Sequence, residues 1–243
     1  MNFDNNWNAR FVWHGMDGNE YWGSISVTDF IAEMTDSNIA LELFSPARDF
    51  EDLLGKVEKD AAVYVQWCTK YEVLNALQQD SLRNFFMGAI GELFFTFFFA
   101  ERKRIYVESQ SRIFDFHDIV PRPVTASDYG VDMTGKVTVD NTVYSCVFQS
   151  KFWSHKAGMP MLPMTYEIAA KAYCDGVLSC GLDPAADRSI FICWTGSMDR
   201  VSVWLKKSPV YPKLVFIDRD IVDQNTSDPV FWQAFADFVK RIN

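Results

Sequence analysis

The sequence lacks the motifs on which several familiar chemistries depend. It has three histidines, His14, His117 and His155, and their spacing is not that of a zinc site. None of its five cysteines forms a C-x-x-C pair, which indicates reduced thiols rather than a disulfide framework. It contains no Walker A loop, G-x-G-x-x-G, H-E-x-x-H or G-x-S-x-G. Nucleotide-binding loops, zinc proteases and serine hydrolases of these types are therefore not indicated.

An apolar run long enough to cross a bilayer is also missing. The most apolar stretch, Phe85–Ala100, has 16 residues and carries Glu92 near its middle, whereas a membrane-spanning helix needs about 20. We expect a helix buried inside the protein and no membrane contact. The first residues lack the basic and apolar regions of a signal peptide, so a cytoplasmic location is expected.

Apolar and aromatic residues are plentiful. Of the 243 residues 49% are hydrophobic, with 21 Phe, 8 Trp and 9 Tyr, which is enough for a large core and excludes general disorder. The net charge of −9 is concentrated in residues 1–60, whose net charge is −8. We expect an acidic N-terminal subdomain or extension at 1–60 and a main domain at 61–243. The acidity is interpreted either as solvated surface or as a subdomain that restricts access or contacts another protein.

The pattern along residues 61–243 predicts alternating helices and strands. Residues 1–60 are expected to be mixed and to contain strands, and 109–130 to be irregular. The main domain is therefore expected to be α/β with a mixed sheet. The expected helices are 60–100, 163–179 and 231–242, and the expected strands are 105–108, 131–139, 142–153, 190–195 and 213–218.

The two central strands form the clearest pattern, a hairpin with Asp140-Asn141 as its two-residue turn. If Val139 faces Thr142, the same register places Asp132 opposite Gln149. Side chains alternate along a strand, so Gln149 and Lys151 share one face. An acid, an amide and an amine are thus expected to converge on one side of the sheet. A register slip of one residue would separate them.

Glu92 is the second unusual feature. Nearly all its neighbours in the expected helix are apolar, and a buried carboxylate without a partner is costly. A metal ion or a lysine would compensate for its burial. Small residues nearby, Gly88, Ala89 and Gly91, would let the helix approach a sheet closely.

These residues resemble the PD-(D/E)XK nuclease superfamily, most closely its Mrr-like branch, in which the motif reads QXK. The acid-bearing strand reads Tyr129-Gly130-Val131-Asp132, the lysine strand Phe148-Gln149-Ser150-Lys151-Phe152-Trp153, and the helix carries Gly91-Glu92. The resemblance covers roughly residues 75–220. It implies a restriction-endonuclease-like αβββαβ core with a mixed central sheet flanked by helices, and a small N-terminal extension.

The resemblance also implies an activity, Mg²⁺-dependent endonucleolytic hydrolysis of phosphodiester bonds in DNA. Asp132 would bind Mg²⁺, for which Mn²⁺ is the expected substitute, with Gln149 and the Ser150 backbone carbonyl as weaker oxygen ligands. Lys151 would orient the attacking water or stabilise charge on the phosphate. Glu92 would complete the metal's surroundings. Phosphate contacts are expected from His155, Lys156 and Lys171.

Other interpretations of these residues remain open. Asp132 could be an ordinary strand-end acid, Gln149 a satisfied amide and Lys151 a solvent-facing amine. The protein would then be a catalytically inactive relative that binds nucleic acid or a protein partner, or a protein-interaction module whose acidic segment binds a basic partner. Restriction, phage defence and DNA repair are the settings that the resemblance implies. A homodimer is one option, because nucleases that cut both strands often work in pairs.

Overall fold

The computed structural model describes residues 8–14, 20–69, 75–122, 131–152, 164–182 and 190–242. Two compact units emerge from its backbone contacts. Unit 1 comprises residues 1–89, 123–126 and 228–243, and unit 2 comprises residues 90–122 and 127–227. The first boundary falls inside helix α3 (Ala76–Glu101) rather than after residue 60. The functional division at residue 60 stays a prediction.

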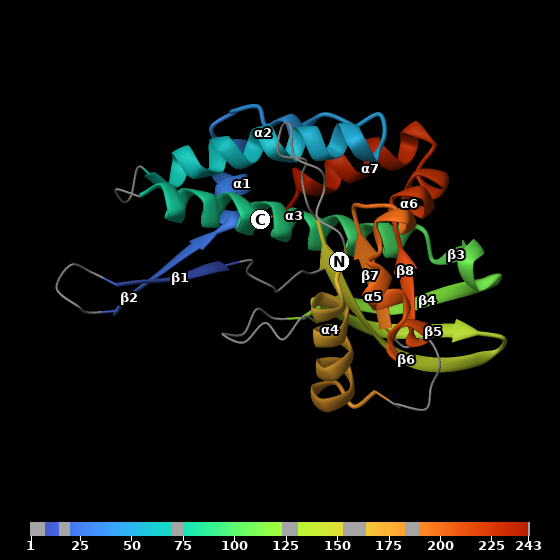
Figure 1. Cartoon of the computed structure of the whole chain (residues 1–243). Coiled ribbons are helices and arrows are strands. Elements are labelled where there is room, and N and C mark those ends of the chain that lie inside the picture. The colour runs from blue at the N-terminus through green and yellow to red at the C-terminus, as the bar shows by residue number, and fades with distance from the viewer. Residues whose placement is uncertain are drawn as a thin grey trace. The chain divides into compact units, whose positions relative to one another are not determined.

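Unit 1 is mainly helical. A two-stranded antiparallel ribbon precedes its helices, as expected for a mixed N-terminal region. The predicted helix at 60–100 belongs to two helices, α2 and α3, and the first of them starts at Phe50. The elements, shown in Figure 1, are β1 (Asn8–His14), β2 (Glu20–Ser26), α1 (Val27–Asp36), the 3₁₀ helix η1 (Glu42–Phe44), α2 (Phe50–Thr69), the start of α3, and α7 (Pro229–Val239).

Aromatic side chains form the core of unit 1. The Phe30 ring lies 5.2 Å from Tyr64, and the Tyr64 ring lies 5.1 Å from Phe86. All three are fully buried, and Trp67 packs beside Phe30. These rings join α1, α2 and the first part of α3, because large aromatic surfaces contribute most when removed from water together.

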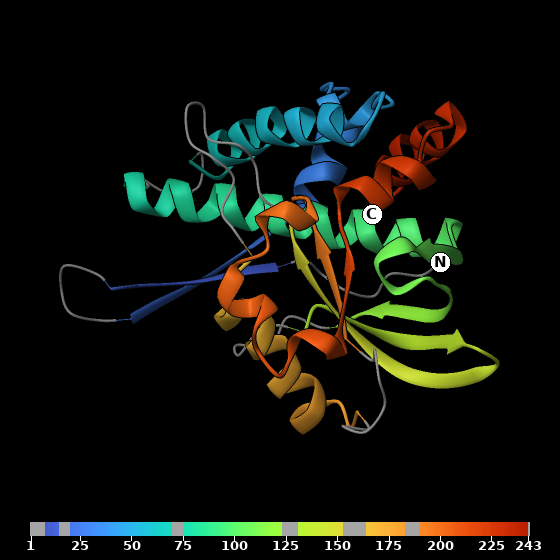
Figure 2. The ribbon, with the colours of Figure 1, turned by 45° about the vertical axis from the view of Figure 1, so that its right-hand side comes forward.

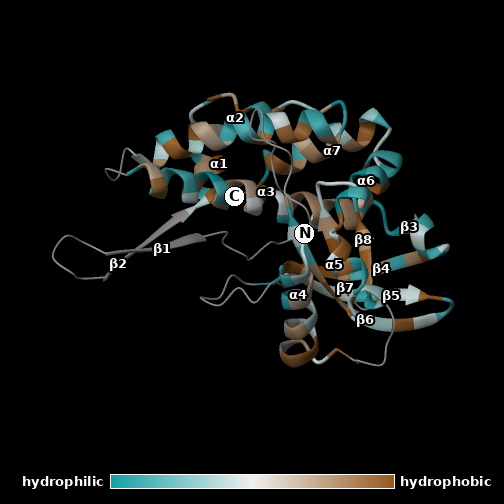
Figure 3. Ribbon diagram, in the orientation of Figure 1, coloured by the Kyte–Doolittle hydropathy of each residue, from teal (hydrophilic) through white to brown (hydrophobic). Residues whose placement is uncertain are grey.

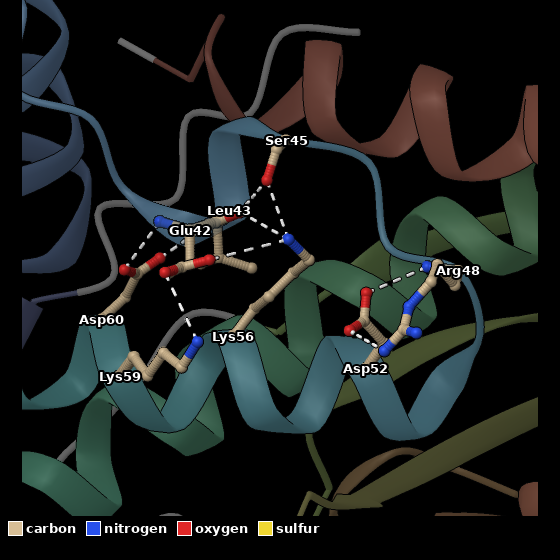
Figure 4. Close-up of polar contacts among 8 residues, drawn as sticks. All are labelled: Glu42, Leu43, Ser45, Arg48, Asp52, Lys56, Lys59 and Asp60. Carbon is tan, nitrogen blue, oxygen red and sulfur yellow. Dashed lines mark hydrogen bonds and ion pairs between the residues drawn. The ribbon is translucent and has the colours of Figure 1, made fainter.

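A buried acid holds the short helix η1 against α2. The Asp60 carboxylate is 1% exposed and accepts hydrogen bonds from the backbone N–H groups of Glu42 (2.9 Å) and Leu43 (2.8 Å). Lys56 donates to the hydroxyl of Ser45 at 2.8 Å (Figure 4). The first N–H groups of any helix have no hydrogen-bond acceptor within the helix. The Asp60 carboxylate is the acceptor for two of them in η1.

Unit 2 is built on a six-stranded mixed sheet with the order β3-β4-β5-β6-β7-β8. The first four strands are antiparallel, and β6, β7 and β8 are parallel. Figure 3 shows hydrophobic residues concentrated along β7 and β8, as expected for strands covered on both faces. The elements are the second part of α3, β3 (Arg104–Val107), β4 (Arg112–Pro121), β5 (Met133–Val139), β6 (Thr142–Lys151), α4 (Tyr166–Ser179), β7 (Ile190–Trp194), α5 (Val203–Lys206), β8 (Leu214–Ile217) and α6 (Arg219–Asn225), with 3₁₀ turns η2 (Glu108–Gln110), η3 (Met198–Arg200) and η4 (Tyr211–Lys213).

The sheet separates two apolar layers. On the α3 face the Phe99 ring lies 4.8 Å from Phe148, and Phe148 lies 5.1 Å from Phe191. On the α4 face Val147, Ile192 and other buried side chains form a separate cluster with residues of α4 and α5. Consecutive residues of a strand therefore pack into opposite apolar layers, because side chains alternate between the two faces of a sheet.

Most expected strands and helices of unit 2 are confirmed, with one clear error. Residues 109–130, expected to be irregular, contain the ten-residue strand β4. Its register with β5 shifts between His117 and Val120, and Asp118 has φ of 53°. The expectation rested on Pro121, Pro123 and Gly130, but Pro121 is the last residue of β4, and Pro123 and Gly130 come after the strand.

Helix α3 is the one described helix that is long and apolar enough to cross a membrane, so the expectation that no run reaches that length is wrong. In its most apolar window 72% is buried inside the protein. Such burial is what the core helix of a folded domain shows, in agreement with the expected buried helix.

Candidate functional site

The β5–β6 hairpin has the register that the sequence predicts. Val139 faces Thr142, and the pairing continues to Met133 opposite Phe148. The turn residues Asp140 and Asn141 have φ of 49° and 63°. Positive φ at both positions is the geometry of the two-residue turn that matches the twist of the strands. The predicted turn and register are confirmed.

Asp132 departs from this register by one residue. The ladder ends at Met133, and the Asp132 N–H donates to the Phe148 carbonyl at 2.8 Å. Asp132 and Met133 therefore both lie opposite Phe148, as in a β-bulge. The predicted direct opposition of Asp132 and Gln149 is wrong, because the register reasoning assumed an uninterrupted ladder.

The bulge places the Asp132 carboxylate next to Ser150, the residue after Gln149. The Asp132 Oδ2 atom accepts a hydrogen bond of 2.5 Å from the Ser150 N–H. A backbone N–H of a strand points within the plane of the sheet, so the carboxylate lies at the end of the hairpin, where β5 and β6 separate. It is thus adjacent to the main chain at the centre of Gln149-Ser150-Lys151.

Gln149 and Lys151 share one face, as predicted. Val147, two residues before Gln149, belongs to the apolar cluster on the α4 face, while Phe148 contacts Phe99 on the α3 face. Alternation then places Gln149 and Lys151 on the α4 face and Ser150 on the α3 face. Asp132 contacts the main chain of Ser150 at the end of the hairpin, and the convergence of its carboxylate with the side chains of Gln149 and Lys151 stays a prediction.

The side chain of Gln149 is unusual in its surroundings. It is 2% exposed, and its Oε1 atom accepts no hydrogen bond from any residue that the structure describes. A buried acceptor left in this state costs about 1–3 kcal/mol. The amide oxygen therefore suits a donor or a cation brought by a ligand.

Lys151 is half-buried at the last position of β6, opposite Trp194 of β7. Its carbonyl accepts from the Thr195 N–H and hydroxyl, both at 3.3 Å. These contacts fix the strand end. Within the described residues its amine forms no ion pair.

Glu92 lies on the part of α3 that passes this end of the sheet. Four residues further along the helix, and on the same side of it, the Thr96 hydroxyl contacts the Met133 sulfur at 3.3 Å. A Cβ on Gly91 would come within 2.2 Å of Phe152. Glu92 therefore belongs to the helical segment beside Asp132 and Phe152. It is half-buried, so the burial that its apolar neighbours predicted is only partial.

The Asp132 carboxylate also affects its neighbour in β7. Burial, together with the nearby charge of Asp132, raises the pKa of the Cys193 thiol well above its usual range. Cys193 pairs with Ser150 across the parallel strands. The thiol is thus held protonated beneath the acid, and it does not compete with oxygen ligands for a hard cation.

The remaining predicted residues lie apart from this group or outside the described ranges. Lys171 is exposed on α4. His155 and Lys156 fall in 153–163, outside the described residues. No group of three or more His, Cys, Asp or Glu side chains suited to a metal occurs among the residues that the structure describes.

Two nearby features were not singled out by the sequence. A hollow of about 450 Å³ lies beside the hairpin, lined by residues that include Arg122 and Lys136, and the Arg122 N–H donates to the Asp132 carbonyl at 2.8 Å. Helix α5 exposes Trp204 next to Lys206 and Lys207. The run Trp204-Leu205-Lys206-Lys207 is the signal that could have drawn attention to α5, whereas the hollow depends on long-range packing.

Comparison with protein-family models, curated proteins and solved structures finds no match for this chain. The established class is therefore that of a mixed α/β protein with a six-stranded mixed sheet flanked by helices.

Proposed function

We propose that this protein is a metal-dependent nuclease that hydrolyses phosphodiester bonds of DNA. The observation that carries the proposal is the Asp132 carboxylate at the open end of the hairpin, bonded to the middle residue of Gln149-Ser150-Lys151. An acid, an amide oxygen and an amine on adjacent strand ends are the site residues that the PD-(D/E)XK resemblance implies. The first two would bind the metal, and the amine would act on the phosphate or the attacking water.

The order of elements supports the same proposal. With the edge strand β3 left aside, helix α3, strands β4, β5 and β6, helix α4 and strand β7 form an αβββαβ series in chain order. The first three strands of this series are antiparallel, and β7 is parallel to β6. This is the finer fold that the resemblance implies for a restriction-endonuclease-like core, with β3 and β8 as additional edge strands.

The donor set fits a hard divalent cation. Mg²⁺ and Mn²⁺ prefer oxygen ligands and commonly take one or two protein groups, with water and substrate phosphate completing the shell. Asp132 supplies a carboxylate, and Gln149 supplies a buried amide oxygen without a donor among the described residues. A bound cation would supply charge stabilisation at the phosphate. Lys151 lies on the same face as Gln149 and would neutralise the developing charge.

Replacing Asp132 by Asn tests the proposal, because Asn keeps an oxygen for the Ser150 N–H and removes the charge. We expect Asp132→Asn to weaken Mn²⁺ binding in calorimetry by more than the roughly 10–100-fold that loss of an outer-shell partner causes. Mg²⁺-dependent cleavage of plasmid and single-stranded DNA should fall below detection. Lys151→Met should bind Mn²⁺ and cleave about 10²–10³-fold more slowly.

Asp118→Asn is the matched control. Asp118 is an exposed acid of β4 whose carboxylate lies 3.4 Å from Lys136, and its loss should change neither property. Cleavage by Asp132→Asn at the wild-type rate would refute the proposal. So would a wild-type protein that neither binds Mn²⁺ nor cleaves any DNA or RNA substrate.

A further inference from the structure

Helix α5 presents an aromatic side chain to solvent. The Trp204 indole is 81% exposed, and it makes no ring contact within the described part of the chain. The buried indoles of Trp67, Trp194 and Trp232 are at most 8% exposed. Tryptophan is highly buried on average in folded proteins, so an indole this open is best explained by a partner that covers it.

Basic residues lie close to Trp204 in the sequence. Lys206 and Lys207 are exposed at the end of α5, and neither forms an ion pair with a described residue. Between residues 198 and 213 the bases are Arg200, Lys206, Lys207 and Lys213, and the one acid is Asp199. The segment is therefore basic in a chain whose net charge is −9. Its charge is complementary to an anionic partner.

The backbone of α5, which carries the exposed Trp204, is fixed by buried contacts and hydrogen bonds. Leu205 is fully buried in the apolar cluster on the α4 face. The Ser202 hydroxyl accepts from the Leu205 N–H at 3.1 Å, and the Ser202 N–H donates to the Met164 carbonyl at 3.0 Å. With its backbone fixed, Trp204 loses little further freedom when it binds.

This surface and the candidate site lie on the same side of unit 2. Helix α5 packs beside α4 (Figures 1 and 2), and the faces of Gln149 and Lys151 are directed to that same layer. The segment that leads to α5 begins directly after Trp194, the partner of Lys151 in β7. Helix α5 and Lys151 therefore lie on the same face of the sheet.

We infer that Trp204 stacks on an unpaired base of nucleic acid while Lys206 and Lys207 contact its phosphates. The inference rests on the proposed nuclease function and names its substrate class, nucleic acid with unpaired bases. Base–aromatic stacking beside cations is the common mode of single-strand binding. Bases inside an intact duplex are stacked on each other and leave no free π-face for the indole.

Other partners fit the surface less well. Membrane-binding helices need an extended apolar face, and α5 has four residues. The centres of protein interfaces are depleted of lysine, whereas two lysines lie within three residues of Trp204. A nucleic acid strand accounts for both the indole and the charges.

Binding without catalysis tests the inference. Fluorescence anisotropy would follow the whole protein binding a labelled oligothymidylate of about 20 nucleotides, longer than the roughly 4–16 that a small domain covers. With EDTA present, Trp204→Ala should weaken binding about 5- to 150-fold, the equivalent of roughly 1–3 kcal/mol per stacked base. Trp204→Phe should retain most of the affinity. Leu178→Ala, which removes an apolar side chain that is 83% exposed on α4, should have no effect.

The lysines provide a second readout. Each phosphate contact on a single strand contributes about 0.7 to the slope of log affinity against log salt. Lys206→Gln with Lys207→Gln should therefore lower that slope by about 1.4. Trp204→Ala should leave the slope unchanged, because stacking releases no counterions.

The outcomes separate this inference from the nuclease proposal. Tight binding of the oligonucleotide by Asp132→Asn, with cleavage lost, supports both. Normal cleavage by Asp132→Asn with binding lost in Trp204→Ala overturns the nuclease site alone. Wild-type affinity in Trp204→Ala, or equal affinity for a duplex, overturns the inference. Trp204-dependent binding to phosphatidylcholine–phosphatidylserine vesicles, or Trp204-dependent self-association, without oligonucleotide binding would overturn it as well.

Discussion

At the scale of single residues, the buried amide of Gln149 is expected to lower the stability of the fold and to serve ligand binding. Its Oε1 atom has no donor among the described residues, and Val147, two residues before it on the same face, belongs to the apolar cluster. Burial of this kind lowers stability, since the amide gives up water and gains no protein partner. A side chain of this type is expected where a ligand completes its bonds.

Replacing Gln149 by Met tests this interpretation. Met has a similar volume and no strong acceptor, so we expect the free energy of unfolding to rise by about 1–2 kcal/mol. The same variant should bind Mn²⁺ more weakly. Urea unfolding followed by circular dichroism measures the first effect, and calorimetry the second. A loss of stability in Gln149→Met would contradict the assignment and make the amide a structural group.

At the scale of elements, two glycines of α3 provide a matched pair. A Cβ on Gly91 would lie 2.2 Å from the Phe152 Cβ, whereas a Cβ on Gly88 would meet nothing within 4 Å. Gly91 is therefore required for the close approach of α3 to the end of β6. Gly88 has no such role.

The two alanine variants should change stability in opposite directions. Gly88→Ala should stabilise the protein by about 0.5–1 kcal/mol, the gain expected from helix propensity. Gly91→Ala must displace Phe152 and should destabilise it by about 1–3 kcal/mol, the usual cost of overpacking. Thermal unfolding of both variants measures the difference. Equal stability of the two would mean that α3 does not approach Phe152 this closely.

The elements also show which features the sequence could predict. The hairpin register was predictable because the turn residues and the strict period of two leave one arrangement with apolar Phe148 and Phe152 directed to a core. The position of Asp132 was not predictable. The bulge that sets it forms where β5 separates from β6, and the period of two does not show where that separation begins. Strand β4 was missed for a different reason, because Pro121 and Pro123 at and after its end favoured an irregular segment. The exposure of Trp204 was not predicted, because the sequence does not show which side chains of a short helix the rest of the fold will cover.

At the scale of the whole molecule, each compact unit contains a buried acid that is costly to ionise. Burial raises the pKa of Asp60 in unit 1 and of Asp218 in unit 2, in each case to about 6. The backbone N–H groups of Glu42 and Leu43 partly offset burial at Asp60, and the Ile221 N–H does so at Asp218. Because the folded state holds these protons more tightly than the unfolded chain, both acids stabilise the protein at low pH.

This stabilisation is fully present below the ordinary carboxyl pKa of about 4 and is lost as pH rises through about 6. Between pH 5.5 and pH 7.5 each acid should lower the free energy of unfolding by about 0.8 kcal/mol. The starting pH lies above the pI of 4.8, where solubility is lowest. The double variant Asp60→Asn, Asp218→Asn should remove about 1.6 kcal/mol of this dependence, measured by urea unfolding at several pH values.

Asp52→Asn is the control for that experiment. The Arg48 guanidinium, 2.9 Å away, helps to hold the pKa of Asp52 below its usual range despite partial burial. An acid with a lowered pKa loses its contribution only as pH falls below about 4. Its replacement should therefore leave the slope between pH 5.5 and 7.5 unchanged. A slope that survives in the double variant would show that other groups, and not these two carboxylates, set the pH dependence of the fold.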